Sequence, residues 1–183
     1  MTFTANDLSK LADSAVVAWQ AGLDQDWSVP AGTLTWSCFL TADHTVDCVF
    51  SYALFLASRA TDAYPPFGEV HALAEATPND LVNGLVAMTN LLIAIVTTTP
   101  PEVRAIIRRH PAPAVGTPED FAARGAHELL LHTHDICAGL GVPFMPPEPA
   151  CLRLRDHTAP WPIGPEMAAT ADPWQDLLRR SGR

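Results

Sequence analysis

Four short segments of this sequence carry the same signal for the start of a helix. Each has a Thr or Asp, then a proline, then an acidic or amide residue two positions later: Thr77-Pro78-Asn79-Asp80, Thr99-Pro100-Pro101-Glu102, Thr117-Pro118-Glu119-Asp120 and Asp172-Pro173-Trp174-Gln175. The first side chain can cap free backbone N–H groups, and the third helical residue can bond back to the cap. Proline is favoured between them because its missing N–H would be unpaired there. The pattern predicts four helix starts.

These starts and the apolar spacing predict an all-α fold. We expect one domain over residues 1–183, with a four-helix bundle over about 4–140. The long helices of the bundle are expected at about 4–22, from Ser37 or Thr41 to about 60, at 78–98 and at 118–140. A short helix is expected at about 101–109. Residues 141–183 hold 8 of the 17 prolines among many apolar residues. That segment is expected to wrap along the bundle in extended form and to end in a short helix at about 173–180.

The charge of the chain argues against binding to nucleic acid. It has 11 basic and 20 acidic residues, a net charge of −9, and Lys10 is its one lysine. The longest unbroken apolar run, Leu91 to Val96, is far shorter than the roughly 20 residues of a membrane span. The first residues lack the basic segment of a secretory signal. We therefore expect a cytoplasmic protein without a membrane partner, and reduced, mostly buried cysteines at Cys38, Cys48, Cys137 and Cys151.

The most informative polar residues lie in the helix expected over 118–140. Glu128 and His132 are four positions apart and Asp135 follows three later, so all three share one helix face. Leu131 stands where the zinc-peptidase pattern H-E-x-x-H needs its second histidine, which excludes that pattern. An ordinary solvated Glu–His pair is the alternative to a functional site.

A further histidine lies in the helix expected after Ser37. His44 is at helical spacing from Leu40 and Cys48 and therefore faces inward. It is either a hydrogen-bonded core residue or a ligand. Together with Glu128 and His132 it would supply two imidazoles and a carboxylate, a set that suits a divalent transition metal such as zinc and leaves coordination positions open.

Three motifs resemble a known family. They are Trp36 followed eight residues later by His44, the run H-E-L-L-L-H-T-H-D-I-C-A-G-L-G-V-P-F over 127–144, and the ending D-P-W-Q-D-L-L-R-R-S-G-R over 172–183. They are similar to the N-terminal domain of mycothiol-dependent maleylpyruvate isomerases, within the DinB-like superfamily. The resemblance implies a DinB-like four-helix bundle, a metal held by His44, Glu128 and His132, and a low-molecular-weight thiol, mycothiol or a similar one, as co-substrate.

The polar residues around these motifs are given narrower roles. Asp135 either orients His132 or lies on the helix surface. Arg124 either clamps an anionic substrate or pairs with Glu128 one turn later. The others are expected to be structural: solvated aspartates at Asp43 and Asp47, surface histidines at His127 and His134, and core aromatic residues at Trp36 and Tyr52.

Three functions follow from this interpretation. The first is a metal-dependent enzyme, with zinc or else nickel, iron or manganese, that activates a thiol for transfer to a small electrophile or for thiol-assisted isomerisation. The second is a thiol-independent metalloenzyme in which the ion acts as a Lewis acid in hydrolysis or a biosynthetic rearrangement. The third is a non-catalytic helical module whose apolar faces bind a partner or a second copy. The helix at 78–98 is apolar around much of its circumference, which is compatible with a homodimer.

Overall fold

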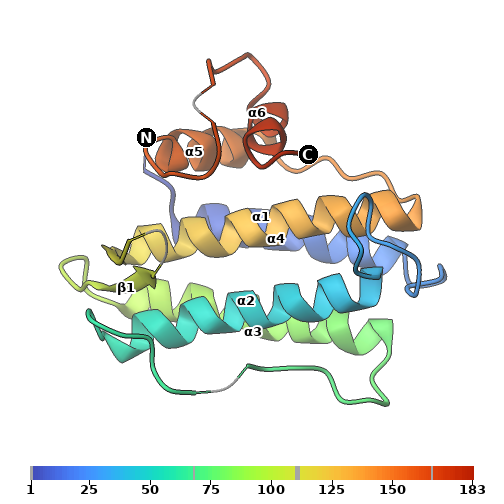
Figure 1. Ribbon diagram of the computed structural model, residues 1–183, viewed down its shortest axis with the longest axis horizontal. Helices are drawn as coiled ribbons and strands as arrows, with labels where there is room; N and C mark the ends of the chain where they lie inside the picture. Colours follow the sequence, from blue (N-terminus) through green and yellow to red (C-terminus); the bar gives the residue numbers. More distant parts are fainter. Residues whose placement is uncertain (1, 68, 110–111, 166) are drawn as a thin grey trace.

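The computed structural model describes residues 2–67, 69–109, 112–165 and 167–183. Within these residues the chain forms α1 (Ala5–Ala21), α2 (Cys38–Ser58), α3 (Pro78–Thr98), β1 (Ala105–Arg108), β2 (Ala114–Gly116), α4 (Pro118–Leu140), α5 (Glu148–Thr158) and α6 (Pro173–Arg180). The expected all-α class is confirmed, apart from one small two-stranded sheet. Figure 1 shows α1 to α4 lying alongside one another, with α5 and α6 on the side of α1 and α4.

Three of the four predicted helix starts are confirmed. The side chain of Thr77 accepts a hydrogen bond from the backbone of Asp80, that of Thr117 from Asp120, and that of Asp172 from Gln175. The Thr77 and Thr117 caps are reciprocal, because Asp80 and Asp120 each accept from the backbone of their capping threonine. A similar reciprocal cap joins Thr4 to Asp7 at the start of α1.

The prediction of a helix start at Thr99 is wrong. Thr99 ends α3: its hydroxyl donates to the carbonyl oxygen of Ile95 at 2.6 Å, and its backbone N–H donates to the same oxygen at 3.0 Å. The short helix expected over 101–109 is also wrong, because β1 pairs there with β2 in antiparallel fashion. The β-branched residues Ile106 and Val115 face each other in this pairing and favour extended backbone.

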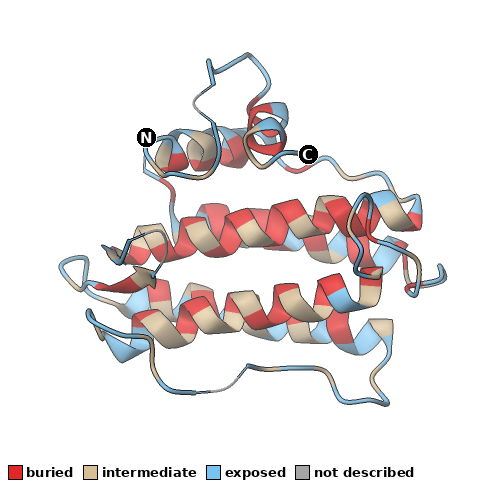
Figure 2. Cartoon of the chain, viewed as in Figure 1, coloured by how far each residue is buried: buried red, intermediate tan, exposed pale blue. Residues whose placement is uncertain are grey.

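The core fills the space between the long helices, where Figure 2 shows most of the buried positions. Trp19 of α1 is fully buried, and its indole Nε1 donates to the hydroxyl of Thr133 on α4 at 3.1 Å. Leu56, Leu92 and Leu130 bring α2, α3 and α4 into one apolar cluster. Helix α2 packs along α4, and this packing brings His44 and Tyr52 of α2 next to His132 and Glu128 of α4.

The C-terminal segment differs from the expected extended wrap. Its final helix, α6, lies where it was predicted, but α5 precedes it as a further helix that buries Cys151 and Leu154. No side chain caps α5 at Pro147, which is why the capping pattern did not reveal it.

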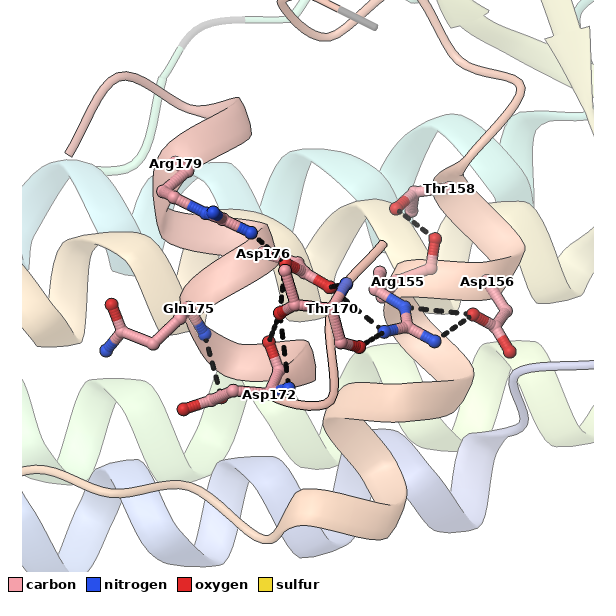
Figure 3. A network of polar contacts seen from close by, with 8 residues as sticks. All are labelled: Arg155, Asp156, Thr158, Thr170, Asp172, Gln175, Asp176 and Arg179. Atoms are coloured by element: carbon pink, nitrogen blue, oxygen red, sulfur yellow. Dashed lines mark hydrogen bonds and ion pairs between the residues drawn. The ribbon is translucent and has the colours of Figure 1, made fainter. Parts of the chain in front are cut away.

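A network of polar contacts joins α5 to α6 (Figure 3). The buried carboxylate of Asp176 accepts from the backbone and hydroxyl of Thr170, each at 2.8 Å, from Arg155 at 3.0 Å, and from Arg179. Burial works against the charged form, but these donors outweigh it and lower the pKa of Asp176 to about 2.

Helix α3 is both long and strongly apolar. Among the described residues, it is the one helix that could cross a membrane by length and composition, with a mean hydropathy of 1.8 over a window that is 33% buried. The unbroken apolar run Leu91 to Val96 covers only part of this helix, so run length alone understates its apolar character. The helix packs against α1, α2 and α4, so part of its apolar surface lies in the core of the long helices.

Candidate functional site

Two long helices bring the predicted metal ligands together. The side chain of Ser37 caps α2, and His44 follows two turns later, while Glu128 and His132 lie in the middle of α4. The ring centroids of His44 and His132 are 5.2 Å apart at an interplanar angle of 77°. Nε2 of His132 lies 3.7 Å from Oε2 of Glu128. His132 therefore has two of the predicted partners as neighbours: His44 across the α2–α4 interface and Glu128 one turn earlier on α4.

The imidazole of His44 contacts an aromatic ring and a thiol. The indole of Trp36 meets its ring edge-on at a centroid distance of 5.2 Å, and Sγ of Cys48 lies 3.4 Å from its Nε2. Burial and the nearby ring of His132 lower the pKa of His44, which favours the neutral imidazole that a metal ion requires. Trp36 is 47% exposed, so the prediction that it is a core residue is wrong.

Glu128 is held from α2 and from its own helix. The hydroxyl of Tyr52 donates to its Oε1 at 3.5 Å, and Nη2 of Arg124 lies 3.5 Å from the same oxygen. The predicted pairing of Arg124 with Glu128 is thus present, although it is long. Tyr52 is buried, as expected, and burial together with the charge of Glu128 raises its pKa, so its hydroxyl remains a donor.

Asp135 is a buried partner of His132 and not a surface residue. Its side chain is only 4% exposed, and its Oδ2 lies 3.3 Å from Nδ1 of His132. Arg183 binds the same carboxylate with two nitrogens, Nε at 2.9 Å from Oδ1 and Nη2 at 2.6 Å from Oδ2. Burial raises the pKa of Asp135, but its contacts with His132 and Arg183 outweigh this and lower it. The carboxylate therefore stays charged beside the imidazole.

The sequence missed three of these contacts. Arg183 reaches Asp135 from 48 positions away, and no local spacing signals that pair. Cys48 follows His44 at helical spacing and Tyr52 was expected in the core, but neither signal showed that Cys48 contacts His44 or that Tyr52 contacts Glu128. Burial and the charge of Glu128 raise the pKa of the Cys48 thiol to about 12, which keeps it protonated.

Other residues near the motifs have structural roles that differ from those expected. Asp47 and Asp43 are not simply solvated: they accept from the backbone N–H groups of Val70 and Ala72, at 2.9 and 2.7 Å, and so hold the segment before α3 against α2.

Two histidines of α4 were expected at the surface. His127 is 5% exposed, and burial lowers its pKa to about 4, so that expectation is wrong for His127. The ring of His134 packs edge-on against Trp174 of α6, with a centroid distance of 5.8 Å.

The donor set fits a divalent metal ion in two of its spacings. Two imidazoles bound to one tetrahedral ion have centroids about 5 Å apart, and two nitrogen or oxygen ligands are about 3.4 Å apart, given metal–ligand bonds of about 2.1 Å. The observed values are 5.2 Å between the rings and 3.7 Å between His132 and Glu128. Among the described residues, however, no three His, Cys, Asp or Glu side chains form a complete ligand group.

Nδ1 of His132 is a buried atom that has no hydrogen-bond partner among the described residues. Nδ1 of His132 lies within ion-pair distance of Asp135 but makes no hydrogen bond, and it is shielded from solvent. An unpaired buried polar atom costs free energy, and such atoms in proteins often mark a functional group.

The chain matches no model of a known protein family, no curated protein and no solved structure.

Proposed function

We propose that His44, Glu128 and His132 bind a divalent metal ion, most simply zinc, and that the protein is a metal-dependent enzyme of the DinB-like, mycothiol-dependent isomerase type. The observation that carries this proposal is the convergence of two imidazoles and a carboxylate from α2 and α4, with His44 and His132 at 5.2 Å. The resemblance of the Trp36–His44 and 127–144 motifs points to the same three residues. The substrate would be a small electrophile that accepts a low-molecular-weight thiol or isomerises with its help.

The residues of this chain would divide the work as follows. The charged carboxylate of Asp135 lies 3.3 Å from Nδ1 of His132 without a hydrogen bond and would favour the ring orientation in which Nε2 faces Glu128. Arg183 holds Asp135 in place and keeps it ionised. Tyr52 orients Glu128 through its hydroxyl, and Arg124 offsets the charge of that carboxylate.

Two further features suit thiol chemistry. A bound divalent ion would supply the acidity that deprotonates a coordinated thiol at neutral pH. In the metal-free chain, burial and the charge of Glu128 raise the pKa of the Cys48 thiol to about 12, so this thiol is protonated and not itself an activated nucleophile.

Metal analysis of the purified protein tests the proposal. We expect about one equivalent of divalent metal in the unmodified chain, and a loss of at least about tenfold in metal affinity on His44→Ala or His132→Ala. His134→Ala is the matched control, because it removes an imidazole from the same helix whose ring packs against Trp174 instead. Retention of a full equivalent by His132→Ala would show that the assignment is wrong.

The thiol is tested separately. Cobalt-substituted protein is titrated with mycothiol, and a new sulfur-to-metal absorption band is expected. An unchanged spectrum would favour the Lewis-acid alternative without a thiol. Failure of the unmodified chain to bind any divalent metal would favour the non-catalytic helical module.

A further inference from the structure

Three arginines gather around one pocket of this acidic chain, beside the candidate site. The pocket has a volume of about 470 Å³, and Arg108, Arg109 and Arg124 all line it. Cys48 and Tyr52 form the wall that it shares with the candidate metal site. In a chain of net charge −9, this local excess of positive charge needs a physical reason.

Arg124 has hydrogen-bonding capacity that the protein does not use. Its Nε is shielded from solvent and has no hydrogen-bond partner in the part of the chain that the structure describes, and Oε1 of Glu128 is 3.5 Å from its Nη2. Its guanidinium lies over the rings of Tyr52 and Trp161, at 5.8 and 5.9 Å from their centroids. These rings fix the guanidinium plane, so an incoming acceptor would meet a preorganised fork of donors.

Arg108 presents a second guanidinium to the same pocket. It is half-buried on β1, and its Nε donates to the backbone oxygen of Ala112 at 3.2 Å. None of the ion pairs formed among the described residues involves Arg108 or Arg109. The one acidic residue of the pocket lining, Asp47, already accepts from the backbone of Val70.

We propose that this pocket binds a small organic acid, whose carboxylate is held by Arg108 and Arg124 and whose apolar part lies against Tyr52, Phe55 and Ile107. Arginine forks match the geometry of a carboxylate, and the volume is typical of small-molecule sites. An inorganic anion would make no use of the aromatic and aliphatic wall. The site uses none of the three proposed metal ligands, so it goes beyond the proposed function.

Calorimetric titration with benzoate at low ionic strength tests the site, with inorganic phosphate as the comparison. We expect saturable benzoate binding that weakens at least about tenfold in Arg124→Gln and about fivefold or more in Arg108→Gln. Arg104→Gln is the matched control. That arginine bonds only to the nearby carbonyl oxygens of Pro101 and Val103 and does not line the pocket, so its variant should bind benzoate unchanged.

Several outcomes separate this site from the metal site and from misfolding. His132→Ala, which is expected to lose metal, should still bind benzoate, so the two proposals can fail independently. Thermal unfolding is followed for every variant. If Arg124→Gln does not fold, Arg108→Gln, whose side chain lies on the small hairpin, carries the test. Unchanged benzoate affinity in both folded arginine variants, or phosphate binding as tight as benzoate, would overturn the proposal.

Discussion

The carboxylate of Asp176 holds α5 and α6 together, and Asp176→Asn is expected to weaken them in a pH-dependent way. Asp176 is 4% exposed and accepts from Thr170, Arg155 and Arg179. These donors keep its pKa at about 2, below the value of 3.8 for a free aspartate. Since the folded state binds the proton less well than the unfolded state, the stabilisation is complete above pH 4 and is lost as the pH falls toward 2.

The difference between the two pKa values sets the size of the effect. A fall from 3.8 to about 2 corresponds to about 2 kcal/mol of folding free energy. The network lies near the surface of the α5–α6 pair, so screening by solvent reduces this to about 1 to 2 kcal/mol. Urea unfolding followed by circular dichroism should show this loss for Asp176→Asn at about pH 7, and only about a third of it at about pH 2.5, where the carboxylate of the unfolded chain is protonated and that of the native protein has begun to be.

Asp156→Asn is the matched control for this experiment. Asp156 pairs with the same Arg155, but its side chain is 45% exposed, so we expect a change within about 0.5 kcal/mol. An equal loss for Asp176→Asn at both pH values would refute the reasoning, because the loss would then come from packing and not from ionisation.

Three other predictions concern close packing, the buried ion pair and the thiols. A Cβ on Gly139 of α4 would press on the backbone of the loop before α2, so Gly139→Ala should destabilise the protein by about 1 to 3 kcal/mol. On α3, a Cβ at Gly84 meets only ordinary contacts, so Gly84→Ala should stabilise the protein by about 0.5 to 1 kcal/mol. Thermal unfolding of the two variants gives the sign of each change. Arg183→Gln should cost about 2 kcal/mol or more by leaving Asp135 buried without its partner, and adding Asp135→Asn should cost less than the two single losses together in a double-mutant cycle. Burial raises the pKa of all four cysteine thiols to about 11 or 12. Mass spectrometry should therefore find the thiols unmodified after iodoacetamide treatment of the folded protein and alkylated after treatment in urea. Labelling of the folded protein as fast as of the unfolded protein would contradict this.

The parts of the fold that could be predicted depend on contacts close in sequence. The caps at Thr77, Thr117 and Asp172 involve residues three apart, so their spacing is visible in the chain. The same holds for Glu128 and His132, which share a helix face because they are four apart. Apolar spacing on α2 also indicated that His44 faces inward, which made its approach to α4 predictable once both were helices.

The parts that could not be predicted depend on partners far along the chain. Residues 105–108 become a strand because Val115 and Gly116 pair with them, and local signals before that pairing favoured a helix. The burial of His127 arises because α4 is covered by α1, α2, α3 and α5 on different sides, so no single face of it is the surface. Arg183 meets Asp135 only after α6 has docked.

The stability of His132→Ala distinguishes a binding site from a structural network, independently of activity. If the polar residues of α4 exist to hold the helices together, removing His132 should destabilise the protein, as loss of a buried hydrogen-bond network does. If they exist to bind a ligand, the metal-free protein bears the cost of a buried Nδ1 without a hydrogen-bond partner, and His132→Ala should leave its stability unchanged or raise it. Urea unfolding of the metal-free forms gives the sign. A loss above about 2 kcal/mol would favour the structural network and, with it, the non-catalytic helical module.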